Sequence, residues 1–335
     1  MSMIARRVFV LPLVLMAALA AIYAVLWFVV ATWVEDGFRN WSRVQTERGN
    51  AVEYGTLAVS GFPGPIRLTI PSPEVTSRKG GWQWAADAAV LETRPWDWRR
   101  FRVEIEGKQR AAVPFAGVLR RYSAAPDETL VVGEVDEHGR VSRSLLTVRG
   151  LRLDDAAGVE VLGAKTLSVH MNLREPAGAQ GQGALDLTVQ ANAVHLGAPI
   201  DTPLDRDIQD IALVTTVRGA LPDTILRDAI EAWRRSGGTL EMSHFQIDWG
   251  RLSLRANGTL SVDEGMRPLG ALTADIKGYA ETLSALERAR ILKRQAAAGT
   301  QLALDLLSRR GDGDGRRIVT VPVAAQNGAL YLGPV

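Results

Sequence analysis

The hydrophobic pattern changes along the chain, and its first part is an uncharged run near the N-terminus. Residues Val8–Val34 include no charged side chain. As a helix, this run would be about 40 Å long, which exceeds the roughly 30 Å hydrocarbon core of a bilayer. The pattern therefore predicts a transmembrane helix over residues 8–34, preceded by a tail of residues 1–7.

Helical periodicity continues beyond the uncharged run. Val34, Phe38, Trp41 and Val44 recur at intervals of three to four residues, with polar side chains between them. Gly49 follows as a typical helix stop. We therefore expect a juxtamembrane helix over residues 35–49. It either packs on its own domain, which is the alternative that we favour, or lies on the membrane surface.

The charges that flank the uncharged run predict its orientation. Arg6 and Arg7 precede the run, and Glu35 and Asp36 follow it. The positive-inside rule then places the N-terminus in the cytoplasm, with a single pass through the inner (cytoplasmic) membrane and the bulk of the chain in the periplasm. A cleaved signal peptide is the alternative, because Ala18–Ala20 offers a small-x-small site. We favour the uncleaved anchor, since the apolar run continues well past that site.

After residue 50 the period of the pattern changes from 3.6 to 2. Phe101, Val103 and Ile105, for example, alternate with Arg102 and Glu104. Strands with one apolar and one polar face, separated by Gly, Pro or Asp, are typical of antiparallel sheets. We therefore expect a mainly β (α+β) protein, in which the transmembrane helix is followed by a large curved antiparallel β-sheet with two or three flanking helices. The predicted strands include 65–71, 101–105, 129–135, 145–153, 166–173, 184–194, 208–217, 245–249, 272–276, 301–307, 317–323 and 328–332.

A glycine-rich stretch suggests a division of the exported part. Residues 174–183 read Arg-Glu-Pro-Ala-Gly-Ala-Gln-Gly-Gln-Gly, which is typical of a linker. We therefore expect two β-rich periplasmic subdomains, over residues 50–173 and 184–335. The second is expected to contain helices near 222–236 and 280–298, because apolar residues recur there at helical spacing.

Composition narrows the possible chemistry. The chain has no cysteine, which excludes disulfides, thiolate metal sites and cysteine nucleophiles. Hydrophobic residues make up 47% of the sequence, enough to build a core. The net charge of +2 is small and the basic residues are spread along the chain, so we expect no nucleic-acid partner.

Motifs for catalysis, metal binding and cofactor binding are missing from the sequence. It has no nucleophile elbow, zinc-binding helix or phosphate-binding glycine loop. The four histidines (His138, His170, His195 and His244) are isolated, and His138 is expected in a hairpin turn. Gly311–Gly315 resembles a calcium loop but lacks the later acidic ligand, so we interpret it as a turn. We expect no enzyme, no catalytic or metal site and no cofactor, although folding could bring together a polar cluster that the linear sequence hides.

Seven apolar residues are the best candidates for a contact surface. Four are tryptophans, whose large apolar area and single N–H suit a core, an interface or a platform for sugar or acyl chains. We favour the core or interface. Three are leucines of the second half, expected to line the apolar face of the sheet. These candidates are Trp82, Trp84, Trp96, Trp98, Leu252, Leu254 and Leu272.

Several segments, taken in order, carry a family resemblance. They are the N-terminal anchor, the element Ser60-Gly-Phe-Pro63 leading into Ile66–Pro71, the segment Arg94-Pro-Trp96 and the C-terminal stretch Asn327–Pro334. Together they resemble the bacterial domain of unknown function 2125, a family of single-span periplasmic proteins of uncharacterised role. The resemblance implies a membrane anchor and offers no catalytic residues to carry over.

A looser resemblance rests on the second half. Gly258–Asp263, Gly270–Ile276 and the Leu-rich helix that follows are similar to the closing segment of AsmA-like envelope proteins. Those proteins have one N-terminal span and a long U-shaped antiparallel sheet with an apolar inner face. They are associated with phospholipid movement or outer-membrane assembly, so the resemblance implies a groove for lipid.

Two functional hypotheses follow from the sequence. In the first, the apolar face of the sheet forms a groove that binds or passes lipid, or assists outer-membrane assembly. In the second, the protein is a periplasmic scaffold or accessory subunit that contacts an envelope protein partner through its sheet and its tryptophans. In both, the N-terminal span makes the inner membrane a partner. An open apolar trough would favour the first hypothesis, and a filled sandwich would count against it.

Overall fold

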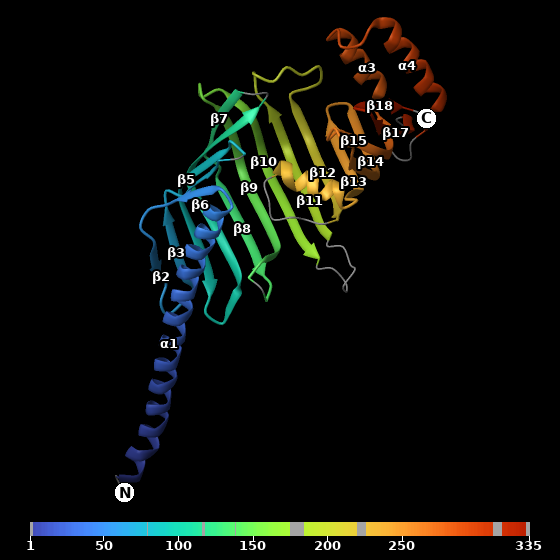
Figure 1. Ribbon diagram of the computed structural model, residues 1–335. Coiled ribbons are helices and arrows are strands. Elements are labelled where there is room, and N and C mark those ends of the chain that lie inside the picture. The colour runs from blue at the N-terminus through green and yellow to red at the C-terminus, as the bar shows by residue number, and fades with distance from the viewer. Residues whose placement is uncertain are drawn as a thin grey trace.

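A single curved sheet dominates the protein. Figure 1 shows it running from the upper half of the long helix α1 (Met3–Glu47) to a pair of helices near the C-terminus, while the N-terminal half of α1 projects away from it. This architecture confirms the expected mainly β fold with an apolar N-terminal helix. The computed structural model describes residues 3–78, 80–115, 118–137, 139–174, 184–219, 226–310 and 317–332.

All strands of the described residues belong to one sheet, and every pairing is antiparallel. From β8 to β15 each strand pairs with the next, and β15 then pairs with β17. Such a meander is the arrangement that alternating strands with short polar turns favour. The strands are β1 (Asn50–Glu53), β2 (Ala58–Ser60), β3 (Ile66–Pro71), β4 (Glu74–Ser77), β5 (Gln83–Arg94), β6 (Asp97–Phe115), β7 (Val118–Ala124), β8 (Glu128–Val135), β9 (Val141–Asp155), β10 (Glu160–Arg174), β11 (Ala184–Leu196), β12 (Asp207–Arg218), β13 (Thr239–Trp249), β14 (Leu252–Val262), β15 (Pro268–Lys277), β16 (Arg309–Arg310), β17 (Arg317–Gln326) and β18 (Ala329–Leu332).

Helix α1 joins the predicted span and the predicted juxtamembrane helix without a break. It ends at Glu47, and Gly49 then takes a φ of 92°, which glycine adopts at little cost. On the side of α1 that faces the sheet, Val34 and Phe38 pack against the cluster around Leu68. The C-terminal part of α1 therefore packs on its own domain, the alternative that we favoured.

The C-terminal helices correct part of the sequence-based expectation. One helix was expected near 280–298 and a strand over 301–307. The protein instead has two helices, α3 (Tyr279–Arg288) and α4 (Arg294–Leu307), and Arg290 takes a φ of 59° between them. The strand prediction was wrong because Leu302, Leu304 and Leu306 alternate over too few residues to distinguish a strand from an exposed helix.

The remaining predictions for the second half are confirmed in part or lie outside the described residues. Helix α2 (Leu226–Arg235) lies within the range expected for the first helix, and residues 220–225 are outside the description. Most of the predicted seam at 174–183 is also outside it, yet β10 and β11 pair directly along their length, so the sheet continues across the seam. The division into two subdomains stays a prediction. His138 and Gly311–Gly315 lie outside the described residues as well.

Candidate functional site

One face of the sheet carries a continuous apolar row. Residues paired directly across antiparallel strands point to the same face, so the strand register shows which side chains are neighbours. Following the register from β2 to β17 gives thirteen apolar residues in succession. The row is Val59, Leu68, Leu91, Val103, Val131, Leu146, Val169, Val189, Leu213, Phe245, Ala256, Ala274 and Val321.

A second row runs beside the first on the same face, two positions along each strand. It is apolar except for Thr129, which is buried and accepts a hydrogen bond from the Gln109 amide at 2.8 Å. We call this side of the sheet the inner face. The second row is Ile70, Ala89, Ile105, Thr129, Val148, Leu167, Ala191, Ile211, Ile247, Leu254, Ile276 and Val319.

Helices cover the inner face at both of its ends. At the N-terminal end, Val34 and Phe38 of α1 belong to the cluster that contains Leu68 and Val103. At the C-terminal end, residues of α3 and α4 pack with Val321 and its neighbours. The two C-terminal helices are linked by the Tyr279 hydroxyl, which donates to Asp305 Oδ1 at 2.7 Å. The ends of the inner face therefore form ordinary helix-on-sheet cores.

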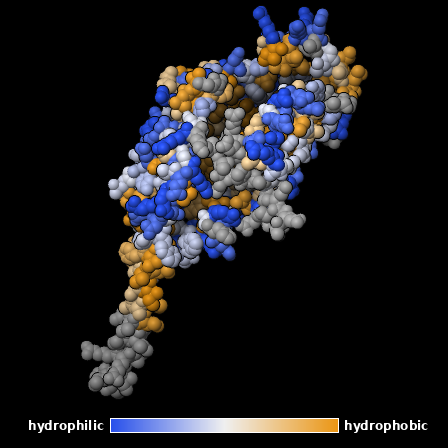
Figure 2. Space-filling view, viewed as in Figure 1, coloured by the Kyte–Doolittle hydropathy of each residue, from blue (hydrophilic) through white to orange (hydrophobic). Residues whose placement is uncertain are grey.

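The middle of the inner face is different. Val131, Leu146, Val169 and Val189 are only half-buried, and none of them belongs to a buried cluster of the described residues. In this part of Figure 2, apolar side chains are visible set back behind hydrophilic ones. Within the part of the chain that the structure describes, no second sheet packs on it. We call the first-row part of this face, formed by Val131, Leu146, Val169 and Val189, the trough; its side chains are half-buried, whereas Val148 and Ala191 of the second row beside them are buried.

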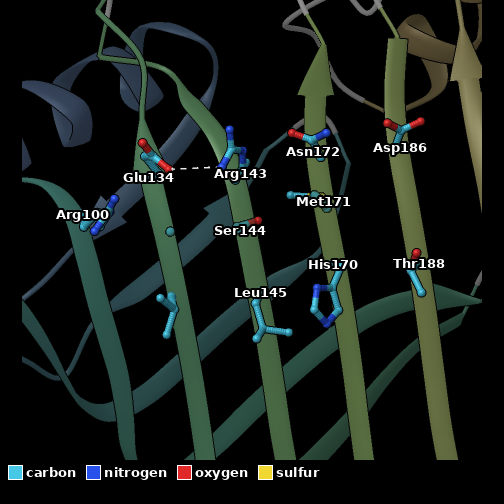
Figure 3. A pocket seen from close by; sticks show the side chains of 12 residues that line it. Arg100, Glu134, Arg143, Ser144, Leu145, His170, Met171, Asn172, Asp186 and Thr188 are labelled. Carbon is cyan, nitrogen blue, oxygen red and sulfur yellow. Dashed lines mark ion pairs between the residues drawn. The ribbon is translucent and has the colours of Figure 1, made fainter.

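The outer face of the same strands is largely polar, although Val132, which is 42% exposed, and Leu145 lie on it as well. A direct cross-strand row carries alternating charge and lines a shallow depression of about 420 Å³ (Figure 3). In it, Glu134 and Arg143 form an ion pair of 3.7 Å. Because positive and negative side chains alternate, the depression has no excess charge with which to concentrate an ionic ligand. The row is Arg100, Glu134, Arg143, Asn172 and Asp186.

Asp186 is the member of this row with a shifted pKa. Partial burial would raise its pKa, but hydrogen bonds from Arg174 and Thr216 outweigh that effect and lower it below the ordinary value of 3.8. The carboxylate is therefore charged near neutral pH and acts as an acceptor. Among the described residues, no group of three His, Asp or Glu side chains is placed to hold a metal ion.

The structure separates the four candidate tryptophans. Trp82 and Trp84 lie at the start of β5, whereas Trp96 and Trp98 lie at the hairpin that follows its end. Twelve residues of strand separate the two pairs by about 40 Å, so they do not form one cluster. Trp84 is half-buried, and Trp96 is 64% exposed.

The three candidate leucines share the inner face near its C-terminal end. Leu254 is part of the second row, and Leu272 pairs with Gly258 on the same side of the sheet. Both pack against the cluster that α3 and α4 cover. Leu252 lies two positions before Leu254 on β14 and pairs with Trp249. They lie on the expected surface but at its covered end, and the trough residues of β8–β11 were not singled out. The alternation of the trough residues was visible in the sequence, but the strand register that aligns them was not.

Fold and surface together define a class of protein: one large antiparallel sheet with an apolar inner face, attached to an N-terminal helix that is long and apolar enough to span a membrane. The chain belongs to the bacterial family described as "Uncharacterized protein conserved in bacteria (DUF2125)", which matches residues 27–335. The resemblance that we saw in the sequence is therefore confirmed. No curated protein and no solved structure matches the chain. The looser similarity to AsmA-like proteins is not shown by these comparisons.

Proposed function

We propose that this protein is anchored in the inner membrane and binds phospholipid acyl chains in its trough, on the periplasmic side. One observation carries the proposal. A row of thirteen apolar side chains runs from β2 to β17, and its middle is only half-buried while helices cover its ends. An exposed contiguous apolar surface in a folded protein marks an interaction site.

The dimensions favour a lipid tail as the occupant. The trough is four strands wide, which is about 19 Å at the usual spacing between strands. One leaflet of a bilayer core is about 15 Å deep, so the acyl chains of a single phospholipid match the open section. Burying eight methylenes would contribute about 6 kcal/mol before ordering costs. The mechanism is desolvation, so no residue needs to perform covalent chemistry, and we propose that the protein is not an enzyme.

The flanking charges support the orientation. Arg6 and Arg7 lie before the span, and Glu35 and Asp36 after it, which favours a cytoplasmic N-terminus. The sheet would then lie outside the cytoplasm, where phospholipids pass between the membranes of the envelope. We therefore propose a role in lipid passage or in outer-membrane assembly.

The test uses the full chain extracted in a mild detergent. Native mass spectrometry and phospholipid analysis of the purified protein are expected to show bound phospholipid. A photo-crosslinking residue at Leu146 or Val169 should label acyl chains, whereas the adjacent outer-face positions Thr147 and Ser168 should not. Protein free of phospholipid, or equal labelling from both faces, would overturn the proposal.

A scaffold role is the second candidate, and one observation favours it. Helix α4 exposes Leu302, Leu306 and Leu307 at 64%, 79% and 64%, which suits contact with a protein partner. In that case, replacing Leu302 and Leu306 by Ser would abolish one stoichiometric complex while leaving phospholipid content unchanged. The corresponding double replacement of Trp96 and Trp98 by Ala tests whether the tryptophans contribute to that contact.

A further inference from the structure

The ends of several strands, which together form one edge of the sheet, lie beside the middle of α1. Residues 61–65 connect β2 to β3, and the β5–β6 hairpin turn lies at the same edge because Ile66 of β3 pairs with Thr93 of β5. The ring of Phe62 stacks on Phe28 of α1 at 5.5 Å between centroids and meets Trp27 edge-on at 5.4 Å. The Tyr23 hydroxyl of α1 also donates to the Pro63 carbonyl at 2.5 Å, so this edge is held at the level of residues 23–28 of the helix.

That level lies about one bilayer-core thickness along the uncharged run Val8–Val34. Trp27 is the first buried residue of α1 among those whose side chains are described, and its indole N–H donates to the Gly64 carbonyl at 2.8 Å. The preceding nineteen residues, Val8–Leu26, are uncharged. As a helix they are about 28 Å long, close to the roughly 30 Å of a bilayer core. A bilayer around this segment would place its headgroups beside Trp27 and the adjoining sheet edge.

The hairpin tip at this edge has the chemistry of a headgroup layer. It is the segment Arg94–Arg100, which contains three arginines and one aspartate. Trp96 and Trp98 are 64% and 48% exposed, and the Arg99 guanidinium lies 5.7 Å from the Trp98 ring centroid. Tryptophan is enriched at membrane interfaces, and arginine binds phosphate through its planar fork of donors.

We propose that Arg94–Arg100 is an interfacial docking site for anionic phospholipid headgroups of the bilayer that α1 crosses. Arg100 is held by Asp97 at 3.4 Å, whereas among the described residues neither Arg94 nor Arg99 has a carboxylate partner. The two are therefore available to phosphate. The site holds the N-terminal end of the inner face at the membrane surface, where lipid would enter. This inference rests on the anchoring by α1 and not on lipid binding in the trough.

The opposite edge provides a matched control. Phe115 and Val118, 64% and 60% exposed, form an apolar tip at the other end of β6. Nineteen residues of strand place the two ends of β6 about 60 Å apart. If exposure alone brought a hairpin to the membrane, both tips would reach it. If the position of α1 decides, the tip at Trp96 reaches it and the tip at Val118 does not.

Because the chain has no cysteine, single cysteines can be labelled cleanly. We would spin-label Trp96→Cys and Val118→Cys in the full chain, reconstituted into liposomes of phosphatidylcholine with phosphatidylglycerol. The label at position 96 should be shielded from a water-soluble nickel chelate and accessible to oxygen, and the label at position 118 should show the reverse. Equal nickel accessibility at the two positions would overturn the inference.

Charge is tested separately. Replacing Arg94 and Arg99 by Gln in the Trp96→Cys protein should lower the ratio of docked to free tip by roughly 30-fold, because each cation contributes about fivefold near an anionic surface. The effect should vanish in liposomes of phosphatidylcholine alone. An unchanged ratio in the anionic liposomes would refute headgroup recognition. Phospholipid retained in the trough is measured in detergent, so either proposal can fail without the other.

Discussion

The two faces of the middle strands are built from adjacent residues, yet they are different environments. On β9, Leu146 belongs to the apolar inner row and Thr147 to the polar outer face; on β6, Val103 and Glu104 divide in the same way. The outer face pairs several of its charged side chains in ion pairs, such as Glu134 with Arg143. The inner face is covered by helices at its ends and is half-buried in the trough. The difference teaches that alternation builds an apolar face whether or not the chain supplies something to cover it.

The largest expected effect contrasts a covered inner residue with its outer neighbour. Leu68 is fully buried beneath α1, so Leu68→Ala should cost about 2–5 kcal/mol in the free energy of unfolding. Arg67 points outward to Glu92 at 2.8 Å, and Arg67→Ala should cost about 0–1 kcal/mol. Chemical denaturation in detergent, followed by circular dichroism, measures both. Equal losses would show that the faces are not distinct at this end.

The next effect concerns the trough. Leu146→Asp places a charge where a methylene chain would lie, so it should weaken phospholipid binding by about 10- to 100-fold, which corresponds to losing the burial of one leucine. The matched variant Thr147→Asp changes the outer face and should leave binding unchanged. Phospholipid content per protein after purification is the measurement. Similar losses in both variants would argue for a general structural defect.

A glycine on the inner face gives a packing test. A Cβ on Gly133 would lie 2.3 Å from Cζ of Phe101, its cross-strand partner, so Gly133→Ala should destabilise the protein by about 1–3 kcal/mol. Phe101→Ala in the same protein removes the clash, so the double variant should lose less than the sum of the single losses. On the exposed side of α1, Gly37 has nothing within 4 Å, and Gly37→Ala should stabilise by about 0.5–1 kcal/mol. Thermal unfolding compares the three positions.

The smallest effect is the pH dependence of the outer face. The pKa of Asp186 is lowered in the folded protein, so its ionised form contributes stability that is present above the ordinary value of 3.8 and is lost as the pH falls through the lower folded value. Asp186→Asn should therefore reduce stability at neutral pH, and the difference from the unaltered protein should shrink in acid below that value. Since the pair with Arg174 is partly exposed, added salt should reduce the difference as well. A difference that does not depend on pH would contradict this origin.

Much of the fold could be predicted from local pattern, and the failures have local causes. The strands from β8 to β12 and the continuous helix to Glu47 were expected, because each has a long run of one period. Helix α4 was mistaken for a strand over 301–307, where a short stretch of leucines fits both periods. The candidate leucines lay on the expected face. The trough itself was missed, since no single strand shows which residues stand beside one another.

The sequence by itself determines two properties of this protein. Val8–Val34 contains no charge to keep it in water, and the alternation after residue 50 gives each strand an apolar and a polar side. Both properties have local causes: the cost of placing a charge in a membrane accounts for the first, and the geometry of the extended chain accounts for the second. Pairing between strands, and the packing of α1, α3 and α4 on the ends of the sheet, are long-range choices. They alone aligned thirteen apolar side chains in one row, left its middle only half-buried and placed Arg94–Arg100 at the level of Trp27, because register and burial depend on contacts between residues far apart in the chain.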